Sequence, residues 1–227
     1  MFKKIMSIVL IFNISIAVTP SLEVEKTFTH IMDHNSWGSK ESVSGNGSTL
    51  KRTEAIRREL PVLIRSLTIT SMCDAPCGDF NWIKKIINRL PLTCYIGIDV
   101  VQKLVDQNNK LHGNKKIKFK QSDIIKSQVL PKVDLILCRD CLVHLPYEDI
   151  LSVLRNFKNS RSTYILMTNF VGERTFIDIK IGQWRPINFQ KPLFNFPVPL
   201  TVINEKNGKP FADKTLSLWR LGDILVE

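Results

Sequence analysis

The turn at residues 74–79 brings two carboxylates and one glycine together directly after a run of apolar residues. Glycine has no side chain, so Gly78 allows the backbone to approach a ligand closely. A dinucleotide site would place the pattern Gly-x-Gly-x-x-Gly here, and two carboxylates would repel a pyrophosphate. The turn therefore favours a cationic small molecule. The residues predicted to form this part of the site are Asp74, Ala75, Cys77, Gly78 and Asp79.

Two more acidic residues stand after later apolar runs. Asp99 comes 21 positions after Gly78, close to the spacing at which an acid binds the ribose hydroxyls in nucleotide sites. Its neighbour Val100 is predicted to lie beside the same ligand. Asp123 is suited to accept a hydrogen bond from an adenine amino group while Ile124 packs on the ring. Taken alone, either acid also fits the role of a turn or helix-capping residue.

A third group of titratable residues follows the apolar run that ends at Cys138. This group contains Arg139, Asp140 and His144. A histidine or a carboxylate at this place is a candidate general base for an acceptor that carries a hydroxyl group. We therefore predict these three residues as the catalytic group. His144 also fits a structural hydrogen-bonding role, so that alternative stays open.

Short apolar runs and longer amphipathic stretches alternate from residue 68 onward. Continuous apolar strands between helices are typical of a parallel sheet that is covered on both faces. Ligands of such doubly wound sheets bind beyond the carboxyl ends of the strands, where the candidate site residues stand. The predicted strands are 67–73, 94–98, 117–121, 133–138 and 164–168, and the predicted helices are 82–88, 101–111 and 147–156.

Further elements are predicted on both sides of this pattern, two strands after it and one helix before it. Residues 200–204 and 216–221 read as two further strands, which would form an antiparallel edge and bring the sheet to seven strands. Ahead of the sheet, a helix is predicted from Leu50 to Leu67, with Ser48 or Thr49 as its cap. Pro61 is expected to limit the continuity of this helix.

Two segments outside the regular pattern are predicted to cover the substrate. The insertion at residues 182–199 contains four prolines and four aromatic residues, which argues against a helix or a central strand. Its Trp184 and Arg185 suit a flat or anionic substrate such as a sugar or an acid. The small, polar residues 35–49 are predicted as a loop, with Trp37 over the substrate. Ordinary surface packing is the alternative for both segments.

The order of these motifs resembles that of the class I S-adenosylmethionine-dependent methyltransferases over residues 68–170. Segments 74–82 and 138–145 are similar in particular to a bacterial-type subset of largely uncharacterised members. The resemblance implies a Rossmann-like fold, S-adenosylmethionine as cofactor, and methyl transfer to an unidentified acceptor such as a small molecule or sugar. It divides the chain into an apolar N-terminal segment (1–18), an N-terminal loop and helix cap (19–67) and a methyltransferase domain (68–227).

The resemblance also implies a role for each matching position. It places Asp74, Cys77 and Gly78 at the methionine part, Asp99 at the ribose, Asp123 with Ile124 at the adenine, and Cys138 with Arg139 where the pocket closes. One position departs from the family's Asp-x-Gly-x-Gly loop, because Pro76 and Gly78 take the two glycine places. Proline supplies no N–H, so the contacts to the methionine part are expected to differ in detail.

The formal net charge of +11 keeps nucleic acid open as a partner. Basic residues gather at 51–58 and 115–120, but no aromatic residues interleave with them at stacking spacing. An RNA methyltransferase and a noncatalytic cofactor-binding module therefore remain alternatives to an enzyme that acts on a small molecule. The single glycine of the turn argues against a nicotinamide oxidoreductase. No membrane or protein partner is predicted.

The cysteines and the N-terminus bear on metal binding and location. Five cysteines are an odd number, which does not suit a disulfide framework, and no metal site is predicted. The pairs Cys73/Cys77 and Cys138/Cys141 leave a zinc site as an alternative. Residues 1–17 resemble a signal peptide or membrane anchor, whereas the cofactor requirement predicts a cytoplasmic location.

Overall fold

A computed structural model describes residues 22–127 and 129–226 of the 227-residue chain. In this part of the chain seven strands form one sheet, in the order β3-β2-β1-β4-β5-β7-β6. Neighbours among β1 to β5 pair in parallel, and β7 pairs antiparallel with both β5 and β6. The strands are β1 (Ser71–Asp74), β2 (Cys94–Asp99), β3 (Ile117–Gln121), β4 (Leu135–Cys138), β5 (Tyr164–Phe170), β6 (Thr201–Asn204) and β7 (Lys214–Arg220). The predicted doubly wound sheet with an antiparallel edge is confirmed.

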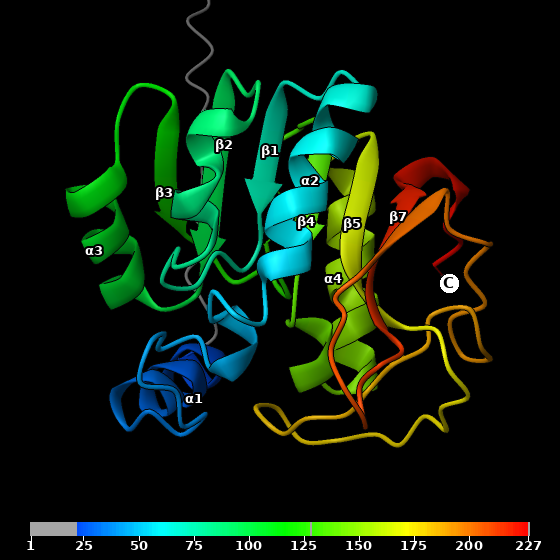
Figure 1. The fold of residues 1–227 in the computed structure, drawn as a ribbon. Coiled ribbons are helices and arrows are strands. Elements are labelled where there is room, and N and C mark those ends of the chain that lie inside the picture. Colours follow the sequence, from blue (N-terminus) through cyan, green and yellow to red (C-terminus); the bar gives the residue numbers. More distant parts are fainter. Residues whose placement is uncertain (1–21, 128, 227) are drawn as a thin grey trace, which may run out of the picture.

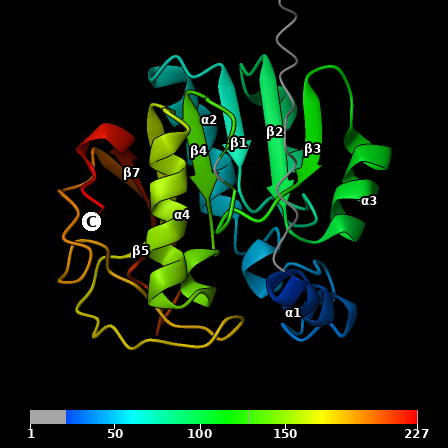
Figure 2. The same ribbon diagram turned by 180° about the vertical axis from the view of Figure 1, so that it is seen from behind.

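Helices cover both faces of the sheet. Figure 1 shows α2 in front of the sheet and α4 behind it, and Figure 2 shows the reverse. Successive side chains of a strand point to opposite faces, so each central strand contributes to two cores. In β4, Leu135 and Leu137 join the core under α2, while Ile136 and Cys138 join the core under α4. The helices are α1 (Leu22–Asp33), α2 (Glu54–Ser66), α3 (Gln102–His112) and α4 (Tyr147–Asn159).

The helix before the sheet differs from the prediction in both its start and its continuity. Its N-cap is Thr53 instead of Ser48 or Thr49. It also runs through Pro61, which is buried. Proline leaves the carbonyl four residues earlier without a helical donor, but here Arg89 donates to the carbonyl of Arg57 at 3.2 Å. This helix ends next to Leu67, so the first strand begins at Ser71 and not at Leu67.

Two other parts of the chain also differ from the prediction. Residues 82–88 form two short 3₁₀ turns, Ile83–Lys85 and Ile87–Arg89, in place of one helix. Three β-branched isoleucines, which have limited rotamer freedom in helices, are buried in this stretch. A helix that the sequence did not predict, α1, lies in the segment expected to be loop and cap.

The lysine-rich residues 115–120 lie along the edge of the sheet. In β3, Ile117 and Phe119 are buried while Lys118 and Lys120 are exposed. Charged side chains on an edge strand disfavour pairing with another chain. This arrangement gives part of the basic charge a structural explanation.

No helix among the described residues has both the length and the apolar character that crossing a membrane requires. The predicted signal peptide or anchor at residues 1–18 lies outside residues 22–127 and 129–226.

Candidate functional site

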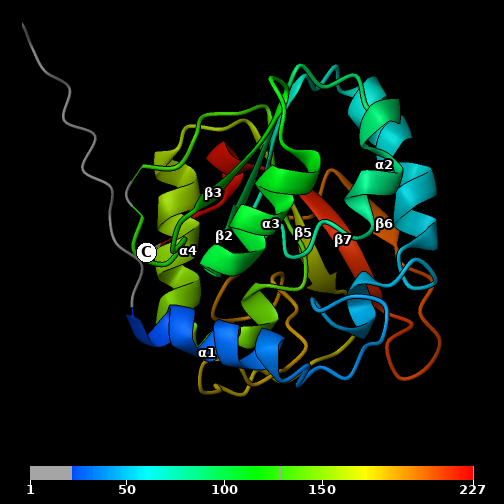
Figure 3. The same cartoon turned by 90° about the vertical axis from the view of Figure 1, so that its left-hand side faces the viewer.

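A cavity of about 460 Å³ lies beyond the carboxyl ends of β1, β2 and β4. Helix α1 and the following loop close over these strand ends (Figure 1 and Figure 3). The volume falls within the range of about 300–1,000 Å³ that is typical of small-molecule sites. Twelve residues predicted from the sequence line it: Trp37, Asp74, Cys77, Gly78, Asp99, Val100, Asp123, Ile124, Arg139, Asp140, His144 and Trp184.

Four residues predicted for the site do not line the cavity. Ala75 and Cys138 are buried in the core under α4. Asp79 instead holds the N-terminal segment. Arg185 is buried, donates to the backbone carbonyl of Leu145 at 2.8 Å, and stacks on an aromatic ring. The structure therefore does not bring Arg185 to the substrate, although the residue before it does line the cavity.

The turn after β1 depends on Gly78, which has a φ of +53°. A Cβ atom at this position would come within 2.2 Å of the Ser44 hydroxyl oxygen. The Gly78 N–H donates to the Asp99 carboxylate at 2.9 Å, and its carbonyl accepts from Asn108 at 2.8 Å. The turn is thereby fixed against β2 and α3.

Asp99 is buried at the end of β2. Its second carboxylate oxygen accepts from the N–H of Val101 at 3.0 Å. Burial raises the pKa of Asp99 to about 6, and the backbone hydrogen bonds oppose this rise. Each carboxylate oxygen keeps a second lone pair that can accept from a ligand hydroxyl.

Asp74, at the end of β1, is also buried. The hydroxyl of Tyr95 donates to its carboxylate at 2.7 Å. Burial raises the pKa of Asp74 to about 7, with the Tyr95 hydrogen bond acting in the opposite direction. Two acids of the cavity thus titrate close to neutral pH and would ionise more readily beside a cation.

Asp123 follows β3 and is the third buried acid of the cavity. Its carboxylate accepts from the N–H of Ile125 at 2.9 Å, so part of its role is to shape the turn. The adjacent Ile124 presents an apolar side chain to the same cavity. The pair therefore offers an acceptor and a flat apolar contact side by side.

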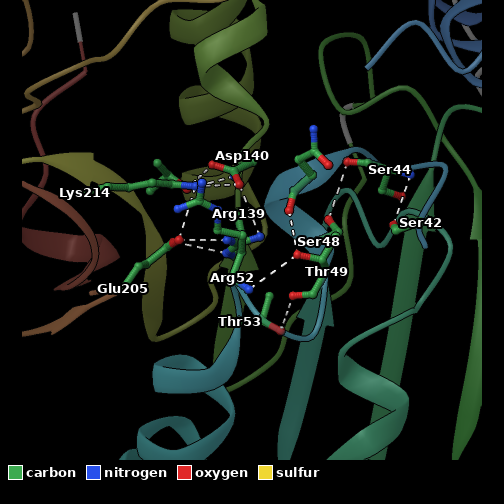
Figure 4. Close-up of polar contacts among 12 residues, drawn as sticks. Ser42, Ser44, Ser48, Thr49, Arg52, Thr53, Arg139, Asp140, Glu205 and Lys214 are labelled. Carbon is green, nitrogen blue, oxygen red and sulfur yellow. Dashed lines mark hydrogen bonds and ion pairs between the residues drawn. The ribbon is translucent and has the colours of Figure 1, made fainter. Parts of the chain in front are cut away.

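Four charged side chains form a network at the other end of the cavity. Arg139 donates twice to Glu205, at 3.1 and 2.8 Å, and lies 3.2 Å from Asp140. Lys214 lies 2.7 Å from Asp140 and 3.2 Å from Glu205. Figure 4 shows the four side chains meeting, two from the end of β4 and two from the C-terminal strands. The network joins the antiparallel edge to the site.

The two candidate bases differ in electrostatic environment. Arg139 and Lys214 hold the pKa of Asp140 well below its usual range, against the effect of burial, so this carboxylate is a weak base. His144 is half-buried, and its Nδ1 lies 2.9 Å from the carbonyl oxygen of Gln183. A carbonyl only accepts, so Nδ1 carries the proton and Nε2 is an acceptor. Burial lowers the pKa of His144, which favours this neutral form.

Residues 22–49, here called the lid, are held to the turn after β1 by Asp79. Its carboxylate accepts from the hydroxyls of Ser42 and Ser44 at 3.0 and 3.2 Å, and from the N–H of Val43 at 3.0 Å. The Asp79 N–H in turn donates to Ser44 at 2.9 Å. Since Asp79 follows Gly78 directly, closure of the lid and the shape of the turn are linked.

Several residues that line the cavity were not predicted from the sequence. The lid contributes apolar side chains, the segment before α2 contributes Arg52, and the C-terminal part contributes charged and aromatic side chains. No local signal marked most of them, because their partners are distant in the sequence; Arg52 stood out only as one of a group of basic residues. They are Val24, Phe28, Met32, Arg52, Phe170, Glu205, Asn207, Phe211 and Lys214.

The four cysteines considered for zinc lie in or just after the neighbouring strands β1 and β4, and two of them, Cys77 and Cys141, line the cavity. Burial raises the pKa of the Cys73 and Cys77 thiols, which favours the protonated form that does not bind metal. Over residues 22–127 and 129–226, the structure assembles no group of three or more metal-ligating side chains.

Comparison with known proteins relates the chain to methyltransferases by fold. No family model matches the sequence, and no curated protein does. A SAM-dependent methyltransferase from Leishmania major is similar over 85% of this chain and 83% of that chain, with 15% identity and a TM-score of 0.65. The methyltransferase SibL is similar over 73% and 54%, with 12% identity and a TM-score of 0.52. The N-methyltransferase NodS from Bradyrhizobium japonicum, in complex with S-adenosyl-l-homocysteine, is similar over 65% and 73%, with 11% identity and a TM-score of 0.50.

These similarities concern the fold. The chain spans 66% of the length of two further bacterial methyltransferase domains that it matches. The seven-stranded sheet with its antiparallel edge is a Rossmann-like methyltransferase arrangement.

Proposed function

We propose that this protein binds S-adenosylmethionine and transfers its methyl group to a small-molecule acceptor. One observation carries the proposal. Three buried acids, Asp74, Asp99 and Asp123, surround one cavity beyond the ends of β1, β2 and β3. Such a set suits a ligand that combines positive charge, ribose hydroxyls and an adenine, because each of these groups offers a cation or a hydrogen-bond donor.

Different residues of the cavity bind different parts of the cofactor. Asp74, with Cys77 and Gly78, faces the amino group and the methionine part. Asp99 accepts from the ribose hydroxyls through the lone pairs that its backbone contacts leave. Asp123 and Ile124 take the adenine. A pyrophosphate cofactor fits poorly, because the same acids would repel it.

The bound cofactor supplies a methyl group on a positively charged sulfur. The protein then has to align the acceptor and exclude water, for which the lid over the cavity is suited. His144 is the candidate base, since Nε2 of its neutral form can accept a proton from an acceptor hydroxyl. Asp140 suits that role less, because two cations stabilise its charged form.

A small acceptor fits this site better than RNA does. The lid and the turn it contacts cover the strand ends, and Lys118 and Lys120 lie on the edge of the sheet, on a different element from those that close the cavity. The positive charge of that edge has its own structural explanation. We therefore propose a small molecule as the methyl acceptor, with RNA as the second candidate.

Calorimetric titration of S-adenosylmethionine into the full-length protein tests the proposal. We expect binding in the micromolar range, and a loss of about 100-fold or more in Asp99→Ala. Asp106→Ala removes an exposed acid of α3 and serves as the matched control with unchanged affinity. Absence of binding by the folded wild-type protein would refute the proposed function.

A further inference from the structure

Three aromatic side chains, Phe170, Trp184 and Phe211, line the cavity together. The ring centroids of Trp184 and Phe211 lie 5.3 Å apart, and those of Trp184 and Phe170 lie 6.0 Å apart. Phe170 is buried, whereas Trp184 is 43% exposed. A large aromatic side chain that stays open toward a cavity is suited to contact a flat ligand.

Arg52 lines the same cavity and differs from its other cations. Arg139 and Lys214 are both within ion-pair distance of Asp140 and Glu205. Arg52 instead donates to a neutral amide, the Asn207 side chain, at 3.1 Å. Within residues 22–127 and 129–226, no carboxylate forms an ion pair with Arg52.

One loop connects the arginine with the aromatic group. The segment between β6 and β7 contains both Asn207, which Arg52 contacts, and Phe211, which packs against Trp184. Figure 4 shows Arg52 on the segment that also holds Thr49 and Thr53. The positive charge and the aromatic surface therefore bound the same end of the cavity.

Arg52 and the four charged side chains of the network together carry one excess positive charge. Arg139 and Lys214 are matched by Asp140 and Glu205, and Arg52 remains as the additional cation. Arg52 is an exposed residue at the cavity, and a guanidinium binds a carboxylate through two parallel N–H donors. An acceptor with a carboxylate would supply the charge that the protein itself does not supply.

We propose that the acceptor is a planar aromatic carboxylate, held by Arg52 at its acidic group and by Trp184 at its ring. This inference rests on the proposed methyl transfer and adds the class of acceptor. It assigns the anion-binding role to Arg52, which is distant from Trp184 in sequence, in place of Arg185.

Binding of matched acids and amides tests this proposal. The probes are 2-naphthoate with 2-naphthamide and 4-hydroxybenzoate with 4-hydroxybenzamide, titrated into full-length protein saturated with S-adenosylhomocysteine. We expect each acid to bind at least tenfold more tightly than its amide. Arg52→Gln should remove this preference, and Arg58→Gln, which alters an exposed arginine paired with Glu59, should keep it.

A second variant separates the ring contact from the charge contact. Trp184→Leu should weaken the acid and the amide by similar factors, so the preference between them persists. Equal affinity of wild-type protein for acid and amide would overturn the proposal, as would an acid preference that survives in Arg52→Gln. Arg52-dependent binding of a short single-stranded RNA without any acid preference would also overturn it, in favour of a nucleic-acid acceptor.

The prior titration with S-adenosylhomocysteine keeps the two proposals distinguishable. Failure of the folded protein to bind this compound removes the proposed function and this inference together. Binding of the compound without discrimination between acid and amide removes only the acceptor class.

Discussion

The burial of Asp74 and Asp99 determines when the cavity can receive a cation. Both carboxyls have raised pKa values, about 7 and about 6, because they are removed from water. A protonated Asp74 must lose its proton before it pairs with the amino group of a cofactor. Under the proposed function, we expect proton release and cofactor binding to be coupled at this residue.

Cofactor affinity should rise with pH up to about neutrality. If binding releases one proton from Asp74, affinity increases by about tenfold per pH unit below pH 7 and levels off above it. Asp74→Asn should bind more weakly and show a flat profile between pH 6.5 and 8. Calorimetry at several pH values, in buffers of different ionisation enthalpy, measures both the affinity and the released proton. A flat wild-type profile would contradict the coupling.

The same residue should make the ligand-free protein less stable as pH rises. Its folded-state pKa of about 7 lies above the ordinary aspartate value of 3.8, so the folded state holds the proton more tightly. The unfavourable contribution develops as pH increases from about 4 to 7 and is complete above 7. Asp74→Asn should therefore be more stable than wild type at pH 8, by about 1–3 kcal/mol in urea unfolding, and the difference should vanish near pH 4. If Asp74→Asn were less stable than wild type at pH 8, this prediction would be wrong.

At the scale of elements, the strand-end residues were predictable and the elements above them were not. Apolar runs mark β1 to β5, and an acid after such a run falls at the ligand-binding edge for reasons of topology. Helix α1 carries Val24, Phe28 and Met32 toward the cavity at helical spacing, but it stands outside the alternation of strands and helices that begins at residue 68, and its segment was therefore predicted as a loop. Arg185, predicted for the substrate, does not line the cavity because its guanidinium points to backbone carbonyls, whereas its neighbour Trp184 does line it.

We expect the lid and the turn after β1 to open and close together, because Asp79 joins them. Asp79→Ala removes acceptors for three hydrogen-bond donors of the lid, while no atom of Asp79 lines the cavity. We expect dissociation of S-adenosylhomocysteine to become about tenfold faster, with faster proteolysis within residues 34–49. Stopped-flow fluorescence and limited proteolysis measure the two effects. With Asp106→Ala as the control, unchanged rates in Asp79→Ala would show that the lid closes without this contact.

At the scale of the whole molecule, one buried network joins the antiparallel edge to the central sheet. Arg139 and Glu205 are 66 positions apart, and Lys214 and Asp140 are 74 apart. Such pairs cannot be predicted from local periodicity: Arg139 and Asp140 were expected in the site, but no nearby residue marks Glu205 or Lys214 as their partners. The overall sheet was predictable, since every strand carries its own pattern. The ion pairs that join the antiparallel edge to the end of β4 were not.

Breaking this network should be costly because Glu205 is fully buried. Glu205→Gln leaves the Arg139 guanidinium, whose side chain is only 4% exposed, with Asp140 as its remaining counter-charge, and Asp140 is shared with Lys214. We expect a loss of about 3–5 kcal/mol in unfolding free energy, measured by urea denaturation. Glu173→Gln removes an exposed acid that pairs with Lys191 and should change stability by less than about 0.5 kcal/mol. Similar small effects for both variants would refute the structural role of the network.

The most direct test of the central claim is a crystal structure of the protein grown with S-adenosylhomocysteine. We expect the ribose hydroxyls within hydrogen-bond distance of Asp99, the adenine beside Asp123 and Ile124, and the homocysteine sulfur directed toward His144 and Trp184. Ligand density at another place on the protein, or a cavity that excludes the ligand at saturating concentration, would contradict it.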